Sequence, residues 1–171
     1  DGDLNRAFKL IELAKEAGAD AAKFQNFQAA TIVSKKGFDA LKKQLSHQAS
    51  WQKSVYEVYQ DASLPLEWTE KLKKKCVEVG LGYLTSPYDI DLVDHVDRYI
   101  DVYKIGSGDI TWHEMLEYIA RKNKPMVLAT GASTLAEVDE AVRIIEATGN
   151  NNIILLQCIT NYPSKIESAN I

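Results

Sequence analysis

Apolar residues follow two patterns, which alternate along this chain. Short, nearly continuous apolar runs predict buried strands at residues 21–25, 81–85, 99–102, 125–131 and 153–158. Between these runs, apolar residues return every three or four positions, which predicts amphipathic helices. Buried strands that alternate with amphipathic helices are typical of an α/β fold with a parallel sheet and right-handed crossovers.

Polar signals mark the expected helix ends. Asp3 is suited to cap the first helix and Gly18 to end it, and Asp89 can cap a short helix after the turn that precedes it. Two residue pairs match the capping box, in which the side chain of each partner bonds the backbone N–H of the other. These pairs are Thr111 with Glu114 and Thr134 with Glu137.

Residues 26–66 form the longest stretch without a predicted strand. An excursion of this length after a strand is more often functional than accidental. We expect helices from about residue 38 and over residues 51–59, with Trp51, Val55 and Val58 on a packing face.

Polar residues stand where the predicted strands end. The carboxyl ends of parallel strands meet at one rim, which is where ligands bind in doubly wound sheets and in (β/α)8 barrels. The chain has no G-x-G-x-x-G at its first helix and no P-loop lysine pattern, which disfavours a nucleotide-binding fold. The residues expected at this rim are Lys23, Thr85, Lys104, Thr130 and Thr160 or Asn161.

The predicted fold is therefore a (β/α)8 TIM barrel, present as a partial barrel. Five predicted strands are too few to close a barrel of eight, so we expect about strands two to six with their helices. On this interpretation residues 1–171 form a single domain that is a fragment. The first strand, the last strands and any C-terminal domain are expected to lie outside it.

One segment of the rim is suited to hold a phosphate. Residues 103–109 read Tyr-Lys-Ile-Gly-Ser-Gly-Asp and follow the predicted strand at 99–102. The glycines let backbone N–H groups approach phosphate oxygens, a helix start near Thr111 adds its dipole, and Lys104 supplies a full charge. A strand-end lysine can also be a solvated edge residue, and this alternative stays open for Lys23.

Composition and charge limit the kinds of binding partner and the cellular locations that this chain can have. The 171 residues are 46% hydrophobic and 26% charged, with a net charge of −4, which is typical of a globular domain and disfavours nucleic acid as a partner. No apolar run approaches the roughly 18 residues of a membrane span, and the N-terminus does not resemble a targeting peptide. Cys76 and Cys158 lack metal-type spacing, which favours reduced thiols and a cytoplasmic location.

Taken together, the motifs resemble those of the N-acetylneuraminate (sialic acid) synthases, a family of phosphoenolpyruvate-dependent nonulosonic acid synthases. The resemblance runs across nearly the whole chain. It departs from the family pattern at residues 158–163, which read Cys-Ile-Thr-Asn-Tyr-Pro where the family usually has Cys-Thr-Ser/Asn-x-Tyr-Pro. The other segments that carry it are Gly2-Asp3, Lys23-Phe24-Gln25 and residues 84–89, 103–109 and 129–133.

The resemblance implies a reaction and the residues that perform it. Phosphoenolpyruvate would condense with an N-acetylated amino sugar, such as N-acetylmannosamine, to give a sialic or related acid and phosphate by C–O cleavage. Lys104 and Asp109 would be catalytic. The residues implied for phosphoenolpyruvate are Lys23, Thr85, Lys104, Ser107 and, with the choice between them open, Thr160 and Asn161. The residues implied for the sugar are Gln25, Asp109 and Tyr162.

The resemblance also implies a divalent metal, Mn²⁺ or Mg²⁺, in the full-length protein. The metal-binding histidines of the family belong to later strands, so we expect ligands beyond Ile171 and none among His47, His95 and His113. This segment alone is therefore expected to bind no metal and to be inactive. The full-length protein is expected to be a homodimer whose partners are its two small-molecule substrates, without nucleic acid or membrane.

Two other functions stay open at this point. Lys104 could be the nucleophile of a Schiff-base aldolase, although the Gly-Ser-Gly sequence beside it favours phosphate binding. A non-catalytic barrel that binds a sugar phosphate is the second alternative.

Overall fold

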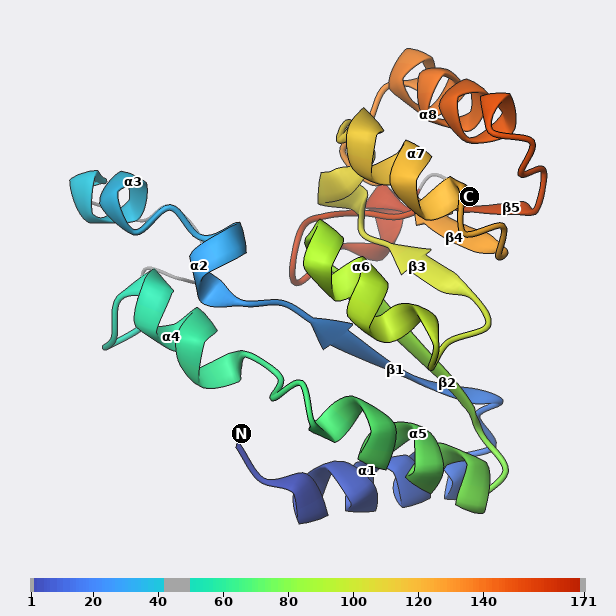
Figure 1. Cartoon of the computed structure of the whole chain (residues 1–171). Coiled ribbons are helices and arrows are strands. Elements are labelled where there is room, and N and C mark those ends of the chain that lie inside the picture. Colours follow the sequence, from blue (N-terminus) through green and yellow to red (C-terminus); the bar gives the residue numbers. More distant parts are fainter. Residues whose placement is uncertain (1, 42–49, 170–171) are drawn as a thin grey trace. The chain divides into compact units, whose positions relative to one another are not determined.

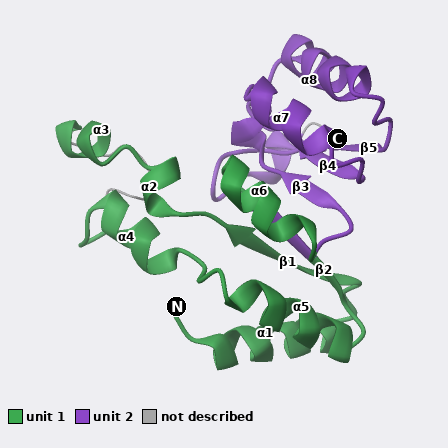
Figure 2. Ribbon diagram, viewed as in Figure 1, with its two compact units in different colours: residues 1–83, 87–99 green, residues 84–86, 100–171 purple. Residues whose placement is uncertain are grey.

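The computed structural model describes residues 2–41 and 50–169. These residues form two compact units, coloured green and purple in Figure 2. Unit 1 comprises Asp1–Tyr83 and Pro87–Tyr99, and unit 2 comprises Leu84–Ser86 and Ile100–Ile171. The single domain expected over residues 1–171 stays a prediction, and His47 lies outside the described residues.

Strands and helices alternate along most of the chain (Figure 1). The strands are β1 (Ala21–Asn26), β2 (Gly82–Pro87), β3 (Tyr103–Ile105), β4 (Met126–Ala129) and β5 (Ile153–Leu156). The α-helices are α1 (Leu4–Glu16), α2 (Ala29–Ile32), α3 (Lys35–Ala40), α4 (Val55–Ala62), α5 (Trp68–Glu78), α6 (Ile90–Asp97), α7 (His113–Ala120) and α8 (Leu135–Ala147). Single 3₁₀ turns, η2 (Ser107–Asp109) and η3 (Ile166–Ser168), follow β3 and β5.

The strands form one sheet in the order β1-β2-β3-β4-β5, which is their order along the chain. The pairing is parallel from β2 to β5, with Thr85 opposite Tyr103 at the junction of β2 and β3. This confirms the predicted α/β fold. Consecutive parallel strands with helices between them are the arrangement expected for part of a (β/α)8 barrel.

Every second residue of β3 and β4 contributes to the core of unit 2. Tyr103 and Ile105 from β3 pair in register with Met126 and Leu128 from β4, and none of the four is more than 2% exposed. Alternate strand residues point to opposite faces, so the apolar face is covered while the residues between them point away from it. Helices α7 and α8 pack on each other and add the buried residues Met115, Leu116, Ile119, Ala141 and Ile145.

Most of the polar helix signals act as predicted. The Asp3 carboxylate accepts hydrogen bonds from the first turn of α1, at 2.9 Å from the nitrogen of Asn5 and 3.2 Å from that of Arg6. Asp89 caps α6 in the same way, and Thr134 with Glu137 forms the predicted capping box of α8. These bonds join residues two or three positions apart, so the local sequence is enough to specify them.

Four element boundaries were predicted wrongly. The helix expected from about residue 38 begins earlier, at Lys35, where the Ser34 side chain caps α3. Strand β3 begins at Tyr103 rather than at residue 99, because its partner β4 begins pairing only there. Thr111 and Glu114 form no capping box, since α7 begins at His113 behind the turn η2, and Trp112 is exposed at its start. The helix expected over residues 51–59 begins at Val55, where Ser54 and Glu57 form a capping box of their own.

Within the described part of the chain, no helix is long and apolar enough to cross a membrane. Both Cys76 and Cys158 are free thiols, and Cys76 is fully buried.

Candidate functional site

Lys104 is the middle residue of β3, between two buried apolar residues. Because Tyr103 and Ile105 point into the core of unit 2, alternation directs the Lys104 side chain to the opposite face of the strand. Its Nζ donates a hydrogen bond to the carbonyl oxygen of Ile105, at 2.6 Å. The cation is thus held against the backbone at the carboxyl end of the strand, one residue short of the predicted strand-end position.

Asp109 closes the 3₁₀ turn η2 directly after β3. Burial raises the pKa of its carboxyl group, and the nearby ammonium of Lys104 and a backbone hydrogen bond with Gly106 oppose this rise. A carboxyl group in this environment can retain a proton to a higher pH than an exposed aspartate. Lys104 and Asp109, the two residues predicted to be catalytic, therefore interact with each other within unit 2.

Three strand ends meet at Gly131. The hydroxyl oxygen of Ser107, after β3, accepts a hydrogen bond from the backbone N–H of Gly131, after β4, at 3.0 Å. A Cβ atom at position 131 would lie 2.9 Å from that oxygen, 2.8 Å from Thr160 Cγ2 and 3.2 Å from Cys158 Cβ, both after β5. Only glycine allows the three strand ends to approach so closely. The rim expected from the sequence is observed for these strands.

The other residues predicted for unit 2 differ in exposure. Thr85 is fully buried and pairs with Tyr103 of β3. Thr160, Asn161 and Tyr162 lie in the exposed segment that follows β5, and the Tyr162 side chain is 80% exposed. Thr160 is the residue whose methyl group reaches Gly131, while the carbonyl oxygen of Asn161 accepts a hydrogen bond from the Ser164 hydroxyl.

Lys23 and Gln25 lie in unit 1, on strand β1, and line one pocket of about 620 Å³. The side-chain nitrogen of Gln25 donates a hydrogen bond to the hydroxyl of Tyr88, at 2.6 Å. Partial burial lowers the pKa of the Lys23 ammonium. Lys23 lines the pocket while its side chain remains exposed to solvent, so its role as a ligand stays a prediction.

Most of the remaining pocket wall is aromatic or aliphatic. Phe27 lies with its ring centroid 5.6 Å from that of Tyr59 and 6.2 Å from that of Tyr88, and the rings of Trp51 and Tyr59 are 6.5 Å apart. The other residues that line the pocket are Phe24, Ile32, Val58, Ala62 and Leu64. Of the three residues predicted to form a packing face, Val55 is buried as expected, whereas Trp51 and Val58 line this pocket.

Sequence reasoning included Gly131 in a family segment but did not predict its crowding, and it did not predict the aromatic wall. The crowding of Gly131 depends on residues that are distant in sequence, so no local sequence pattern predicts it. For the wall, a usable signal was the long interval 26–66, which contains Phe27, Trp51 and Tyr59 and borders a predicted ligand strand.

The two described histidines contact other residues of their own units. His95, in α6, has its Nε2 atom 3.1 Å from the hydroxyl of the buried Thr69, and His113 has its Nδ1 atom 3.9 Å from Glu140. Across residues 2–41 and 50–169, no three His, Cys, Asp or Glu side chains gather closely enough to hold a metal ion.

Comparison with known proteins identifies the family. Residues 10–171 match the NeuB family. The chain is 36% identical over 174 residues to the N,N′-diacetyllegionaminic acid synthase of Campylobacter jejuni, covering 100% of this chain and 52% of that protein. It is 35% identical over 171 residues to the pseudaminic acid synthase of Helicobacter pylori, covering 99% of this chain and 49% of that protein.

A solved structure agrees with the fold. The N-acetylneuraminic acid (sialic acid) synthetase of Leptospira borgpetersenii superposes with a TM-score of 0.84 at 24% identity, covering 99% of this chain and 54% of that one. The chain spans about half the length of the curated relatives that it matches. Because the family match extends over nearly all of the chain, the chain belongs to the NeuB family.

Proposed function

We propose that the protein carrying this chain condenses phosphoenolpyruvate with an N-acylated amino sugar to give a nonulosonic acid and phosphate. The observation that carries the proposal is a segment of a NeuB family chain in which Lys104 interacts with Asp109 while Ser107 bonds Gly131 at the neighbouring strand end. A cation, an oriented hydroxyl and a carboxyl group at one rim suit a small, highly charged substrate.

Lys104 and Ser107 are the proposed anion ligands of unit 2. The Ser107 oxygen already accepts a hydrogen bond from Gly131, so its own hydrogen is available for an oxygen of phosphoenolpyruvate. Lys104 supplies the full positive charge that a phosphate or carboxylate requires. Thr85, Lys23 and Thr160 or Asn161 complete the proposed set for this substrate.

The proposed reaction forms one carbon–carbon bond and breaks one carbon–oxygen bond. C3 of phosphoenolpyruvate attacks the aldehyde carbon of the open-chain sugar, and the aldehyde oxygen takes up a proton to become a hydroxyl group. A water molecule adds at C2, and phosphate leaves with the oxygen that joined it to C2. We assign the proton donation to Asp109, the carboxyl group that follows Lys104 in the turn after β3. Gln25 and Tyr162 are the proposed contacts to the sugar.

A divalent cation, Mn²⁺ or Mg²⁺, belongs to the proposal as a Lewis acid for the aldehyde. The described residues of this chain do not form a site that fits it, so none of the steps above is assigned to the metal. We further propose a cytoplasmic homodimer for the whole protein, and the free thiols of Cys76 and Cys158 are compatible with a reducing compartment.

Phosphate release from phosphoenolpyruvate by the whole protein tests the reaction. With Mn²⁺ present, we expect release that requires an N-acylated amino sugar, and phosphoenolpyruvate labelled with ¹⁸O at the bridging position should place the label in the phosphate. Label retained on the sugar acid would contradict C–O cleavage. Borohydride trapping of a substrate on Lys104 would instead support the Schiff-base aldolase, and sugar binding without any release would support the non-catalytic barrel.

A further inference from the structure

Tyr88 is the first residue after β2, and its hydroxyl meets a side chain of the neighbouring strand β1. The side-chain nitrogen of Gln25 donates a hydrogen bond to this hydroxyl at 2.6 Å, across 63 positions of sequence. Both residues line the pocket of unit 1. Gln25 is a proposed contact to the sugar, whereas Tyr88 takes part in no step of the proposed reaction.

The backbone and the ring of Tyr88 are both held in place within unit 1. Its backbone N–H donates a hydrogen bond to the carbonyl oxygen of Asn26 at 3.0 Å, and its ring meets that of Phe27 edge to face, with centroids 6.2 Å apart. Asn26 is fully buried, and its side-chain nitrogen lies 3.4 Å from the hydroxyl of the buried Thr69. The next residue, Asp89, is fixed because it caps α6. These contacts give the Tyr88 hydroxyl a defined position.

The bond to Tyr88 determines which way the amide group of Gln25 faces. The terminal torsion of a glutamine side chain has broad energy wells, so without a partner the amide group samples many orientations. Because the nitrogen of Gln25 bonds Tyr88, the amide oxygen is directed elsewhere and can accept a hydrogen bond from a hydroxyl or N–H group of a ligand. A side chain that is ordered before the ligand arrives loses less conformational entropy on binding.

We infer that Tyr88 is a positioning residue for the proposed reaction, because its hydroxyl orients the Gln25 amide so that the amide oxygen can accept a hydrogen bond from the amino sugar. The inference rests on the proposed function for the sugar itself. Tyr88 acts through Gln25, so its contribution to sugar binding should vanish when the Gln25 side chain is removed.

The first test removes only the hydroxyl group. Tyr88→Phe keeps the ring and the backbone hydrogen bond at this position. In the whole protein, with N-acetylmannosamine as the sugar, we expect the KM for the sugar to rise about three- to tenfold, because the amide must be ordered on binding. The kcat and the KM for phosphoenolpyruvate should change little. Tyr99→Phe is the matched control, because it removes a tyrosine hydroxyl of the same unit and keeps the ring contacts with His95 and Arg98.

A double-mutant cycle with Gln25→Ala tests whether Tyr88 acts through Gln25. Tyr88→Phe should add nothing to the rise in the KM for the sugar that Gln25→Ala already causes. Two results would overturn the inference. One is a set of additive rises in this KM, and the other is an equal rise in the KM for both substrates together with a lower melting temperature, which would indicate a structural role.

NMR of the glutamine side chains separates this inference from the proposed function. In the whole protein with ¹⁵N in these side chains, the signal of Gln25 is the one that Gln25→Ala removes. It should shift in Tyr88→Phe and stay in place in Tyr99→Phe. If wild type releases no phosphate but the signal shifts in this way, the orienting bond is supported and the synthase reaction is not. An unchanged signal in Tyr88→Phe would overturn the inference even in an active synthase.

Discussion

The backbone N–H of Gly131 donates a hydrogen bond to the hydroxyl oxygen of Ser107 across two neighbouring strand ends, at 3.0 Å. This bond fixes one lone pair of the oxygen and leaves the hydroxyl hydrogen to point elsewhere. It exists because glycine at position 131 allows a close approach, with Thr160 and Cys158 on the other side. The relationship makes Gly131 a positioning residue of the proposed anion site.

Substituting Gly131 should disturb the site through its neighbours. Gly131→Ala places a methyl carbon 2.8 Å from Thr160 Cγ2 and 2.9 Å from Ser107 Oγ, so these groups must move. We expect a stability loss of about 1–3 kcal/mol, as for other overpacked positions, and a higher KM for phosphoenolpyruvate. Urea denaturation and steady-state kinetics measure the two effects.

A second substitution provides the control for this mechanism. Thr160→Ser removes the methyl group nearest to position 131, so it should restore part of the stability that Gly131→Ala loses. Additive effects of the two substitutions would show that the predicted clash is not the cause.

Removing the Lys104 side chain should abolish turnover while the fold persists. Lys104→Ala deletes the charge proposed for the substrate anion, and we expect kcat/KM to fall about 100-fold or more. Its side chain points away from the apolar core of unit 2, so the melting temperature should change little. The matched control is Lys122→Ala in the same unit, whose ammonium lies 4.7 Å from the centroid of the Tyr118 ring. An unfolded Lys104→Ala protein would show instead that this lysine is structural.

The raised pKa of Asp109 predicts a pH dependence of stability in the wild type that the neutral variant Asp109→Asn should lack. In the folded protein this carboxyl group ionises at a higher pH than the ordinary value of 3.8, so the unfolded state releases the proton first. Wild type should therefore lose stability relative to Asp109→Asn as the pH rises from about 3.8 through the raised value. If Asp109 acts as the proton donor, kcat of the wild type should fall as the pH rises through the raised pKa of the folded state. If the stability of both proteins changed with pH in the same way, the raised pKa of Asp109 would be contradicted.

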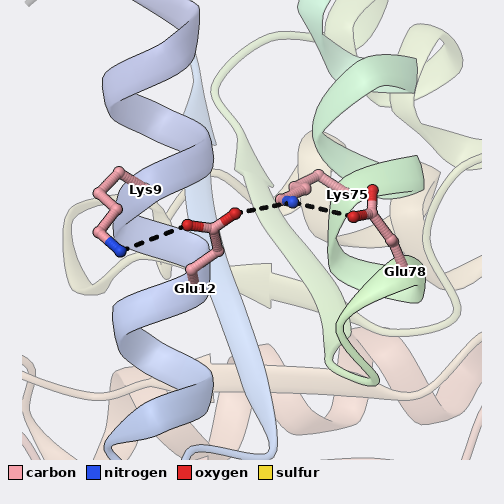
Figure 3. A network of polar contacts seen from close by, with 4 residues as sticks. All are labelled: Lys9, Glu12, Lys75 and Glu78. Carbon is pink, nitrogen blue, oxygen red and sulfur yellow. Dashed lines mark hydrogen bonds and ion pairs between the residues drawn. The ribbon is translucent and has the colours of Figure 1, made fainter.

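An ionic network between α1 and α5 should make unit 1 sensitive to pH and salt (Figure 3). Lys75 Nζ lies 2.8 Å from Glu12 Oε1 and 3.0 Å from Glu78 Oε1, while Lys9 contacts Glu12 at 3.5 Å. The hydrogen bond with Lys75 and its charge lower the pKa of Glu12, and the contacts with Glu12 and Glu78 raise the pKa of Lys75.

The directions of these pKa shifts define the pH range in which the network stabilises the fold. The contribution of Glu12 is lost as the pH falls through its lowered pKa, and that of Lys75 is lost as the pH rises through its raised pKa. Lys75→Met should therefore destabilise the protein near neutral pH, most strongly at low salt. Lys9→Met is the control, because its single contact is longer and exposed, and urea midpoints of both variants at two salt concentrations decide the matter. Equal shifts in the two variants would refute a special role for Lys75.

The sequence by itself determined the features whose causes lie within a few residues. Asp3, Asp89 and the pair Thr134 and Glu137 form the caps that were predicted, because each bond spans two or three positions. The alternation of strands and helices was also predictable, since burial of one face requires apolar residues at a fixed period. The position of the segment 103–109 at the carboxyl end of a strand was also predictable, because it directly follows an apolar run and contains two glycines.

Tertiary structure decided the features that depend on distant partners. β3 begins at Tyr103 because β4 offers its first pairing residue there, and the apolar residues 99–102 alone could not show this. Gly131 is crowded by Ser107 and Thr160, each more than twenty positions away, so its role has no local signature. The pocket of unit 1 likewise joins Gln25 to Tyr88 across 63 positions. Short stretches of sequence specify local hydrogen bonds and apolar periodicity. The close approach of strand ends at Gly131 and the pocket of unit 1 arise only when separate stretches pack together.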